Sequence, residues 1–176
     1  MRFALCLCLA IAFGAIEPLS AQTKVSLLKG SLTFAIPANF QKTPDKGALG
    51  NYAAKDGDEW MSVTLASKPL PHNDLEAWLL RKRAAYSAGL PPEIRSHLRW
   101  IKQKTVMIEG KRWADLRFDC VPDGPDGANR ACLYTRFLAT TIDGHLLEIV
   151  LSSNLTSDAK RKTALDKIAD SVKLKP

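Results

Sequence analysis

A chain of 176 residues has the length of one ordinary domain, and its 25 lysines and arginines against 18 aspartates and glutamates give a formal net charge of +7. This basic balance favours acidic proteins, anionic lipid surfaces or nucleic acid as partners, and it bears on association rather than on fold. Beyond the first 21 residues no stretch is long and apolar enough to cross a bilayer as a helix, so we expect no transmembrane segment there.

The first 21 residues have the layout of a cleavable secretory signal peptide. Arg2 supplies a positive charge, residues 3–16 contain no charged side chain, and Pro18 breaks this apolar run. Leu19-Ser20-Ala21 then ends in the small residue that signal peptidase requires beside the cut. Because the run is shorter than the roughly 20 residues of a membrane-spanning helix, cleavage is favoured over a retained anchor. We expect residues 22–176 to form the mature domain, in the periplasm or outside the cell.

Cleavage would leave two cysteines, Cys120 and Cys132, in a compartment where disulfides persist. The segment between them is rich in proline, aspartate and glycine, as expected for a loop that joins two strands. A hairpin would bring the two sulfurs together, and the bridge would stabilise the fold by roughly 3 kcal/mol. A redox pair usually has two residues between its cysteines, and a zinc site needs more ligands nearby. We therefore predict a structural disulfide.

In the N-terminal half, the alternation of Leu32, Phe34 and Ile36 predicts a strand with one buried side. The dipeptide Asp56-Gly57 is a strong signal for a hairpin turn. The expected elements are a polar lead-in, the strand, a turn-rich segment and the two arms of the hairpin, at residues 22–29, 31–36, 40–49, 52–55 and 60–66.

A helix is predicted to follow Asn73. With Glu76 three residues later, Asn73 forms a variant of the capping box that satisfies the first free amides of a helix. The apolar residues at helical spacing are Leu75, Trp78, Leu79 and Tyr86. Gly89 and the two prolines that follow it end the helix.

From Leu98 onward the chain predicts four antiparallel strands and a closing helix. Turns at Glu109-Gly110 and Asp143-Gly144 join them in pairs. The expected strands span residues 99–108, 111–121, 132–141 and 145–152, and the second buries Ala114, Leu116, Phe118 and Cys120 on one face. The helix begins at Thr156 or Ser157, and its apolar side consists of Ala164, Leu165, Ile168, Ala169 and Val172. This order predicts a single α+β domain, an antiparallel sheet packed by two main helices.

Several local patterns together resemble a known superfamily. They are Phe34-Ala35-Ile36-Pro37 followed by Phe40, Asp56-Gly57 before a strand, Glu109-Gly110-Lys111 before a long strand, Gly144 to Val150, and a closing helix that ends Asp170-Ser171-Val172-Lys173. This arrangement is similar to the PsbP/DcrB-like α/β/α sandwich superfamily of small, often exported domains. The resemblance implies a binding or accessory module, such as a secretion-associated adaptor. It supplies no catalytic residue and does not include the disulfide loop.

The sequence contains no recognisable catalytic or metal-binding constellation. His72, His97 and His145 lie far apart, and none stands within a helix at the spacing that builds a zinc face. The sequence has neither a Gly-x-Ser-x-Gly elbow nor a phosphate-binding glycine loop, and a disulfide sulfur is no thiolate. We therefore expect no enzyme activity, no cofactor and no metal.

The stretch from Arg95 to Lys104 comes nearest to a binding surface. Its candidate partner-binding residues are Arg95, Arg99, Trp100, Lys102 and Lys104. Strand alternation would place Arg95, Arg99 and Ile101 opposite the other three. Nucleic-acid binding would need a longer basic stripe with exposed aromatic residues. A protein partner, with acidic character favoured by the charge, is therefore the better hypothesis.

Three functions are compatible with these observations, in the following order. The first is a non-enzymatic periplasmic binding or accessory module, of the immunity-protein or secretion-associated type, that binds a partner protein. The second is a small exported hydrolase whose site is assembled from distant residues such as His145 and Glu148. The third is a protein that binds envelope lipid or polymer through its positive charge. Salt would weaken this binding.

Overall fold

The computed structural model describes residues 22–45, 47–120, 134–153 and 159–175. Its large sheet contains β3 (Phe40–Thr43), β4 (Gly50–Ala54), β5 (Glu59–Pro69), β6 (Leu98–Ile108), β7 (Lys111–Cys120), β8 (Tyr134–Ile142) and β9 (His145–Ser153). A small sheet contains β1 (Gln22–Leu27), β2 (Leu32–Pro37) and β10 (Lys173–Leu174). The helices are α1 (Leu75–Gly89), α2 (Pro92–Ser96) and α3 (Ala159–Asp170), with 3-10 turns η1 (Leu28–Gly30) and η2 (Pro71–Asn73).

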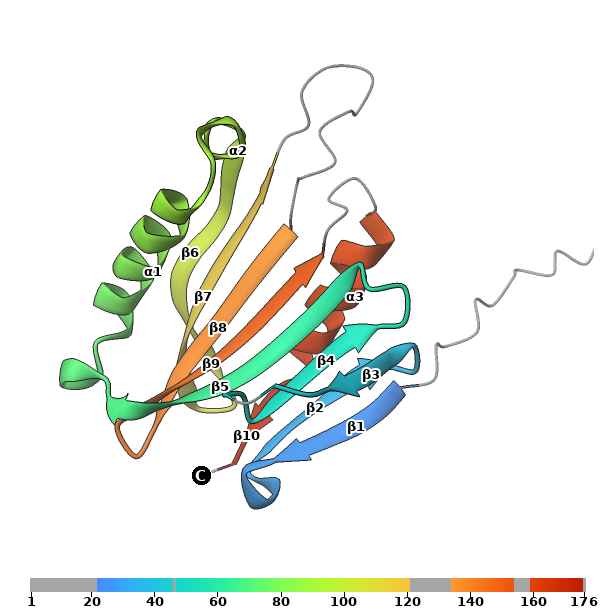
Figure 1. Ribbon diagram of the computed structural model, residues 1–176. Coiled ribbons are helices and arrows are strands. Elements are labelled where there is room, and N and C mark those ends of the chain that lie inside the picture. Colours follow the sequence, from blue (N-terminus) through green and yellow to red (C-terminus); the bar gives the residue numbers. More distant parts are fainter. Residues whose placement is uncertain (1–21, 46, 121–133, 154–158, 176) are drawn as a thin grey trace, which may run out of the picture.

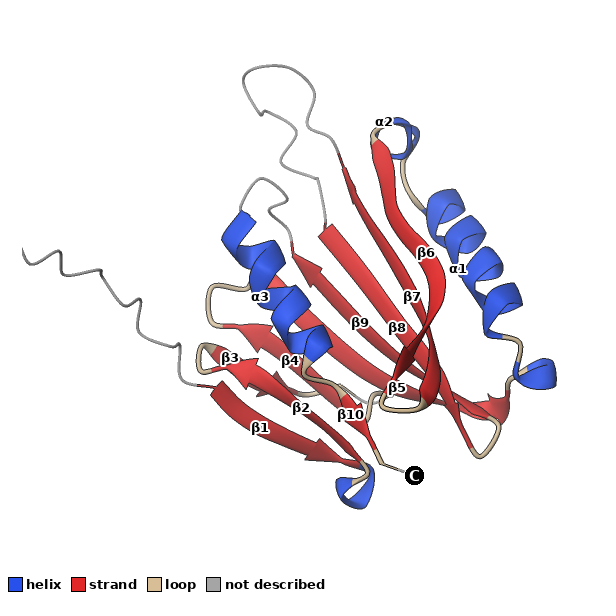
Figure 2. Cartoon of the chain, turned by 180° about the vertical axis from the view of Figure 1, so that it is seen from behind, coloured by secondary structure: helices blue, strands red, loops and turns tan. Residues whose placement is uncertain are grey.

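The seven strands of the large sheet are antiparallel and follow the order β3-β4-β5-β9-β8-β7-β6, as Figure 1 shows. Helix α1 packs on one face, against β6 and β7. Helix α3 and the small sheet cover the other face, which Figure 2 shows from behind. The predicted α+β class, with two main helices on an antiparallel sheet, is therefore confirmed.

Two hydrophobic clusters correspond to the two faces. The larger lies between the sheet and α3, where Leu165 and Ile168 pack with Phe34 of β2 and Ile149 of β9. The smaller lies under α1 and includes Leu75, Trp78, Leu79, Leu116 and Phe118. The apolar faces predicted for both helices and for β2 are thus the buried ones, because periodicity reports which side of an element leaves water.

The lead-in and the turn-rich segment each contain a strand that the sequence did not predict. Residues 22–27 form β1, which pairs with β2 from Gln22 opposite Pro37 to Leu27 opposite Leu32. Within the turn-rich segment, β3 pairs with β4. Both strands lie at sheet edges and are mostly exposed, so backbone pairing rather than a buried face defines them.

The first helix begins one residue later than the capping box predicted. Asp74, not Asn73, is the N-cap, and its Oδ1 accepts hydrogen bonds from the amides of Glu76 at 3.1 Å and Ala77 at 2.9 Å. Asn73 belongs to the preceding turn η2. The helix ends at Gly89 as predicted.

Two other predictions concern residues outside the described ranges. The signal peptide falls on residues 1–21, and the disulfide depends on Cys132 and on the side chain of Cys120. Both stay predictions. Among the described residues, no helix has the length and apolar character needed to cross a membrane.

Replacing Asp74 by alanine should lower the free energy of unfolding by about 1 kcal/mol, because two amides at the start of α1 lose their acceptor. Asn73→Ala is the matched control and should change this free energy by less than about 0.5 kcal/mol. Chemical denaturation measures both variants. A loss confined to Asn73→Ala would place the cap where the capping box predicted it.

Candidate functional site

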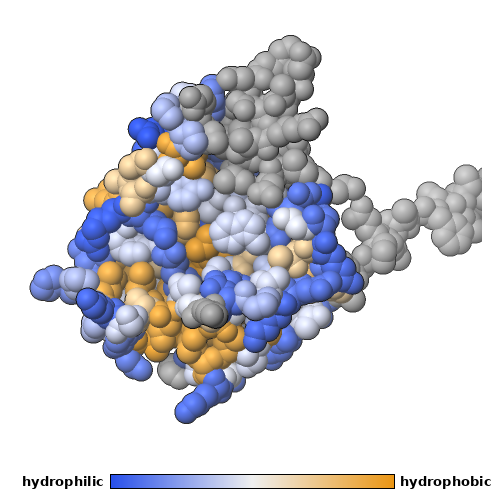
Figure 3. All heavy atoms as spheres, in the orientation of Figure 1, coloured by the Kyte–Doolittle hydropathy of each residue, from blue (hydrophilic) through white to orange (hydrophobic). Residues whose placement is uncertain are grey.

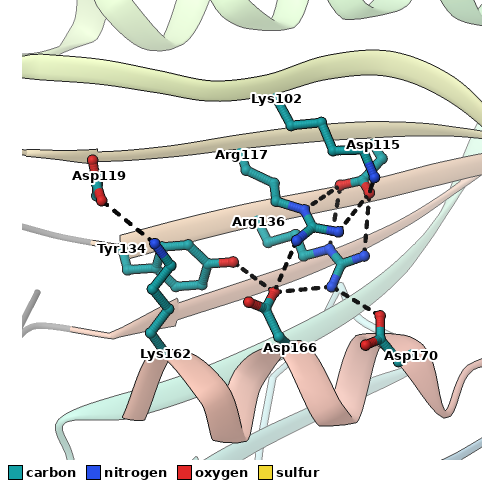
Figure 4. Close-up of polar contacts among 9 residues, drawn as sticks. All are labelled: Lys102, Asp115, Arg117, Asp119, Tyr134, Arg136, Lys162, Asp166 and Asp170. Carbon is teal, nitrogen blue, oxygen red and sulfur yellow. Dashed lines mark hydrogen bonds and ion pairs between the residues drawn. The ribbon is translucent and has the colours of Figure 1, made fainter. Parts of the chain in front are cut away.

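A group of charged side chains lies between α3 and the strands β6, β7 and β8, as Figure 4 shows. We call this group the ionic network; its members are Lys102, Asp115, Arg117, Tyr134, Arg136, Asp166 and Asp170. Asp115 is fully buried and Arg136 nearly so. Because buried charges are tolerated only when they are paired, the contacts of these two side chains matter to the fold.

Asp115 stands at the centre of the ionic network. Its carboxylate accepts hydrogen bonds from Lys102 Nζ at 2.6 Å, Arg117 Nη2 at 2.9 Å and Arg136 Nη2 at 3.2 Å. Arg136 Nη1 then donates to Asp166 at 2.9 Å and to Asp170 at 3.3 Å. This chain of contacts connects three strands of the sheet to α3.

Strand register explains why so many charges meet at one place. Arg117 of β7 lies directly opposite Arg136 of β8, and this would be repulsive without a counter-charge. Asp115, two residues before Arg117 on the same face, provides one carboxylate that both guanidinium groups contact. Asp166 and Asp170 are four residues apart on α3 and therefore lie on one side of that helix. They supply the remaining negative charge.

The electrostatics of the ionic network differ from those of an acid–base site. Burial acts to raise the pKa of Asp115, but hydrogen bonds from Arg117 and Lys102 and the charge of Arg136 outweigh it and lower the pKa to about 2. Burial and the hydrogen bond from its hydroxyl to Asp166, at 2.7 Å, raise the pKa of Tyr134. Asp115 therefore stays ionised and Tyr134 stays protonated at neutral pH. Neither has a pKa near the working pH that general acid–base catalysis requires.

Four of the five predicted partner-binding residues make internal contacts. Arg95 donates to the carbonyls of Ala88 and Leu90 at the end of α1, at 3.2 and 3.0 Å. Arg99 forms a two-bond contact with Asp119, at 2.8 and 2.7 Å, and Lys102 belongs to the ionic network.

The other two residues of the predicted set, Trp100 and Lys104, differ in their surroundings. The ring centroids of Trp100 and Phe118 lie 5.1 Å apart. The guanidinium carbon of Arg83, on α1, lies 4.9 Å from the centroid of the Trp100 ring. Lys104 is exposed and lines a groove beside α1. The predicted residues are thus neighbours along β6, but they do not form one continuous surface.

The predicted alternation of this strand is wrong at Ile101. The register with β7 shifts between Trp100 and Lys102, so one extra residue stands in β6. Such a bulge reverses the faces of the residues beyond it. Consequently Lys102 shares a face with Arg99, and both contact acidic side chains of β7, whereas Trp100 lies under α1.

The groove between α1 and β6 has a volume of about 370 Å³. Its lining residues are Glu76, Leu79, Leu80, Gln103, Lys104 and Thr105. Arg83 donates to Gln103 of β6 at 2.9 Å and Arg112 of β7 pairs with Glu76, so polar contacts join α1 to both strands. Three of the large apolar side chains exposed among the described residues belong to α1 and β6: Leu80 at 62%, Met107 at 66% and Ile101 at 41% exposure.

The alternative site built on His145 and Glu148 does not assemble. His145 Nδ1 lies 2.9 Å from the carbonyl oxygen of Ala66, whereas Glu148 accepts a hydrogen bond from Lys82 of α1 at 2.7 Å. Residues three apart on a strand lie on opposite faces of the sheet. His72 precedes α1 and His97 precedes β6, so the histidines remain dispersed. Within the described ranges no three histidine, cysteine or acidic side chains gather as metal ligands would.

Sequence reasoning missed the ionic network altogether. The predicted alternation identified the apolar face of β7 and gave no role to Asp115, Arg117 and Asp119 on the opposite face. The structure buries Asp115 and Asp119 beneath α3 as well. The available signal was the alternating charge of β7, an arginine in the middle of β8, and two aspartates four residues apart on a predicted helix.

At the level of the fold, this arrangement of sheets and helices is similar to several solved structures. The chain is similar to the solution structure of cyanobacterial PsbP (CyanoP) from Synechocystis sp. PCC 6803, with a TM-score of 0.59 and 16% identity over 97% of this chain and 98% of that one. The predicted resemblance to the PsbP/DcrB-like superfamily is confirmed at the level of the fold.

Two further solved structures share this architecture. The Ran-binding protein Mog1p of Saccharomyces cerevisiae has a TM-score of 0.56 and 15% identity, over 88% of this chain and 96% of that one. LpqN, involved in cell envelope biogenesis of Mycobacterium tuberculosis, has a TM-score of 0.51 and 12% identity, over 89% and 91%. No family model and no curated protein sequence matches the chain. At these identities the likeness defines the fold and leaves the function to the residues of this chain.

Replacing Asp115 by asparagine should lower the free energy of unfolding at pH 7 by about 3 kcal/mol or more, because buried Arg136 and its neighbours lose their central counter-charge. Asp170→Asn is the matched control, since Asp170 contacts the same arginine from an exposed position. It should cost less than about 1 kcal/mol. Equal losses in the two variants would contradict a special role for the buried carboxylate.

The stabilisation due to Asp115 should depend on pH in a defined window. The pKa of Asp115 is about 2 in the folded protein and about 3.9 in an unfolded chain, so the ionised carboxylate favours the folded state above about pH 4. This contribution, about 2–3 kcal/mol, is lost as the pH falls toward 2. Denaturation of the wild type and Asp115→Asn from pH 7 to pH 2 should show their difference shrinking below pH 4. A constant difference would refute the lowered pKa.

Proposed function

We propose that this chain is a non-catalytic accessory module that acts outside the cytoplasm by binding an acidic, extended segment of a partner protein along β6. The observation that carries the proposal is that β6 is an edge strand of the large sheet with exposed apolar side chains. Strand β6 has 11 residues and pairs with β7 and with no other described strand. It carries the exposed apolar side chains of Ile101 and Met107, and Leu80 of α1 is exposed beside it.

Edge strands offer unpaired amides and carbonyls to an incoming strand. The bulge at Ile101 and the exposed, charged Lys104 limit indiscriminate pairing. Beyond the bulge, β6 runs in regular register from Lys102 to Ile108. This regular stretch beside the groove is long enough to pair with a short segment, and it is the place where we put the partner.

Hairpin geometry indicates which amides of β6 face outward. Glu109 and Gly110 both have positive φ, 47° and 78°, as a two-residue type I′ turn requires. In such a hairpin the flanking residues, Ile108 and Lys111, bond to each other, and bonding then alternates along the strands. The amide of Thr105 is therefore expected to point away from β7, toward an added strand.

The chemistry of the surroundings favours an acidic partner segment with an apolar residue. Arg83 on α1, which contacts Gln103, and Lys104 on β6 are exposed beside the groove, while Glu76 is already paired with Arg112. Backbone pairing would supply affinity, and the groove beside Leu79 and Leu80 would accept an apolar side chain of the added strand.

Two of the fold neighbours support this class of function. Mog1p is a Ran-binding protein, so this architecture can carry a protein-binding surface. LpqN is involved in cell envelope biogenesis, which is compatible with the export that the first 21 residues predict. An immunity-type or secretion-associated role in the periplasm is consistent with both. The hydrolase alternative loses its support because His145 and Glu148 lie on opposite faces of β9.

A library of extended peptides displayed on phage, varied in charge, tests the proposal with the purified exported protein. Selection should enrich acidic peptides of high strand propensity. For the best of them, Thr105→Pro should abolish binding measured by calorimetry, because proline removes the outward amide. Thr105→Ala is the matched control and should bind as the wild type does. Lys104→Glu should weaken binding about tenfold, by losing an attractive charge and adding a repulsive one.

Circular dichroism of Thr105→Pro should match that of the wild type, since proline is tolerated where an edge amide faces solvent. Enrichment of no peptide, or of peptides that bind Thr105→Pro undiminished, would overturn the proposal. Binding to anionic lipid vesicles that vanishes at high salt, with no peptide enriched, would favour attachment to the envelope by charge instead.

A further inference from the structure

The two faces of β6 beyond its bulge differ in chemistry. Thr105 lies opposite Ala114 of β7, which packs in the hydrophobic cluster under α1. Its neighbour Lys104 lies opposite Asp115, the centre of the ionic network on the side of α3. Directly opposite residues in antiparallel strands share a face, so Thr105 faces the α1 side and Lys104 the α3 side. A strand added to β6 therefore meets different side chains on its two faces.

The α1 face of this edge is apolar. Leu79 and Leu80 line the groove beside β6, and Leu80 is exposed. Met107 stands two residues after Thr105, shares its face and is exposed as well. Figure 3, in the orientation of Figure 1, shows apolar and hydrophilic side chains next to each other over the part of the surface that α1 occupies. Apolar residues of the added strand opposite Thr105 and Met107 would remove this apolar surface from water.

The α3 face of the edge carries a positive charge. Lys102 on this face already donates to Asp115, whereas Lys104 is exposed. Because the amide of Thr105 points outward, Thr105 and the partner residue opposite it form a hydrogen-bonded pair. Lys104 then stands in a pair without backbone hydrogen bonds, where facing side chains come closest. A carboxylate in the partner residue opposite Lys104 would form an ion pair with it.

We infer that the partner segment runs antiparallel to β6 and carries two apolar residues, separated by one residue, with aspartate or glutamate directly after the second. The described strands of both sheets pair antiparallel throughout, and this pairing is slightly more stable per residue than parallel pairing. In this direction the apolar residues lie opposite Met107 and Thr105, and the acidic residue lies opposite Lys104. The inference rests on the proposed function and adds the order and spacing of the partner's residues.

A general attraction between the basic protein and acidic segments would not impose this order, since net charge acts without regard to position. Strand pairing does impose it. A carboxylate moved to the position opposite Thr105 would lose water beside Leu79 and Leu80, and Lys104 would face an apolar side chain. Parallel docking would require the reversed order of the same residues.

Two peptides of identical composition test the order, with binding to the purified exported protein measured by calorimetry. The first is acetyl-Gly-Thr-Val-Thr-Val-Glu-Thr-Gly-amide, and the second exchanges its glutamate with the valine before it. The first should bind about tenfold more tightly, because it alone places the carboxylate opposite Lys104 and both valines on the α1 face. Equal affinities would overturn the inference, and so would tighter binding of the first peptide's reversed sequence.

A charge exchange tests whether Lys104 contacts the acidic residue. Lys104→Glu should weaken binding of the first peptide about tenfold, and replacing the peptide's glutamate by lysine should restore it to within about threefold of the original affinity. Lys42→Glu is the matched control, since it changes the net charge equally on the exposed edge strand β3. It should bind the first peptide as the wild type does. Absence of restoration would contradict the assigned position.

A second variant covers a loss of folding, because Lys104→Glu places a carboxylate opposite Asp115. If its circular dichroism departs from that of the wild type, Lys104→Gln replaces it. The wild type should prefer glutamate over glutamine at the acidic position of the peptide about threefold, and Lys104→Gln should show no preference. An unchanged preference would overturn the inference.

The outcomes distinguish this inference from the proposed function. Equal binding of the two isomeric peptides, or binding of neither while peptides selected on phage do bind, refutes the order of residues and leaves strand pairing at β6 intact. Undiminished binding of the first peptide to Thr105→Pro, or the absence of any bound extended peptide, refutes the proposed function and the inference with it.

Discussion

The contact between Asp115 and Arg136 is the constraint on which the arrangement of α3 and the sheet depends. Two arginines lie opposite each other on neighbouring strands, and the buried carboxylate of Asp115, together with Asp166 of α3, makes this register tolerable. The same carboxylate holds Lys102 of the edge strand, and Arg136 continues to two aspartates of α3. Edge strand, sheet centre and closing helix are therefore joined electrostatically as well as by the apolar core.

This network also determines which groups of β6 can serve a partner. Arg99 and Lys102 look in the sequence like a basic binding stripe, but Asp119 and Asp115 already compensate their charges. What β6 still offers is its outer backbone, the exposed Lys104, and apolar side chains beside α1. The binding hypothesis therefore depends mainly on backbone pairing between β6 and a strand of the partner. The charge of Lys104 would then select among the partner segments that can pair in this way.

Much of the fold could be predicted because its apolar faces are periodic. Leu32, Phe34 and Ile36 alternate as a half-buried strand must, and Leu165, Ile168 and Ala169 recur as a helix stripe must. Edge strands were harder: Gln22–Leu27 buries little, so its sequence resembles a loop. The one-residue bulge at Ile101 could not be predicted, because the residue pattern is compatible with simple strand alternation on both sides of it.

The candidate sites were less predictable than the fold, for a related reason. Alternating charge on a strand normally indicates a solvated face, and nothing local reveals that α3, more than forty positions later in the chain, covers Asp115. Likewise, only the register with β7 shows that Lys104 lies on the face of α3 and Thr105 on the face of α1. Both sites are products of long-range pairing, which pattern reasoning over short windows does not reach.

The most direct test of this account is a double-mutant cycle between Asp115 and Arg136, measured as the free energy of unfolding at pH 7 for Asp115→Asn, Arg136→Gln and the combined variant. A central buried pair predicts a coupling energy of about 1–3 kcal/mol, with the double variant more stable than the sum of the single losses implies. Additive losses, with a coupling energy near zero, would contradict the claim that this pair holds the sheet and α3 together.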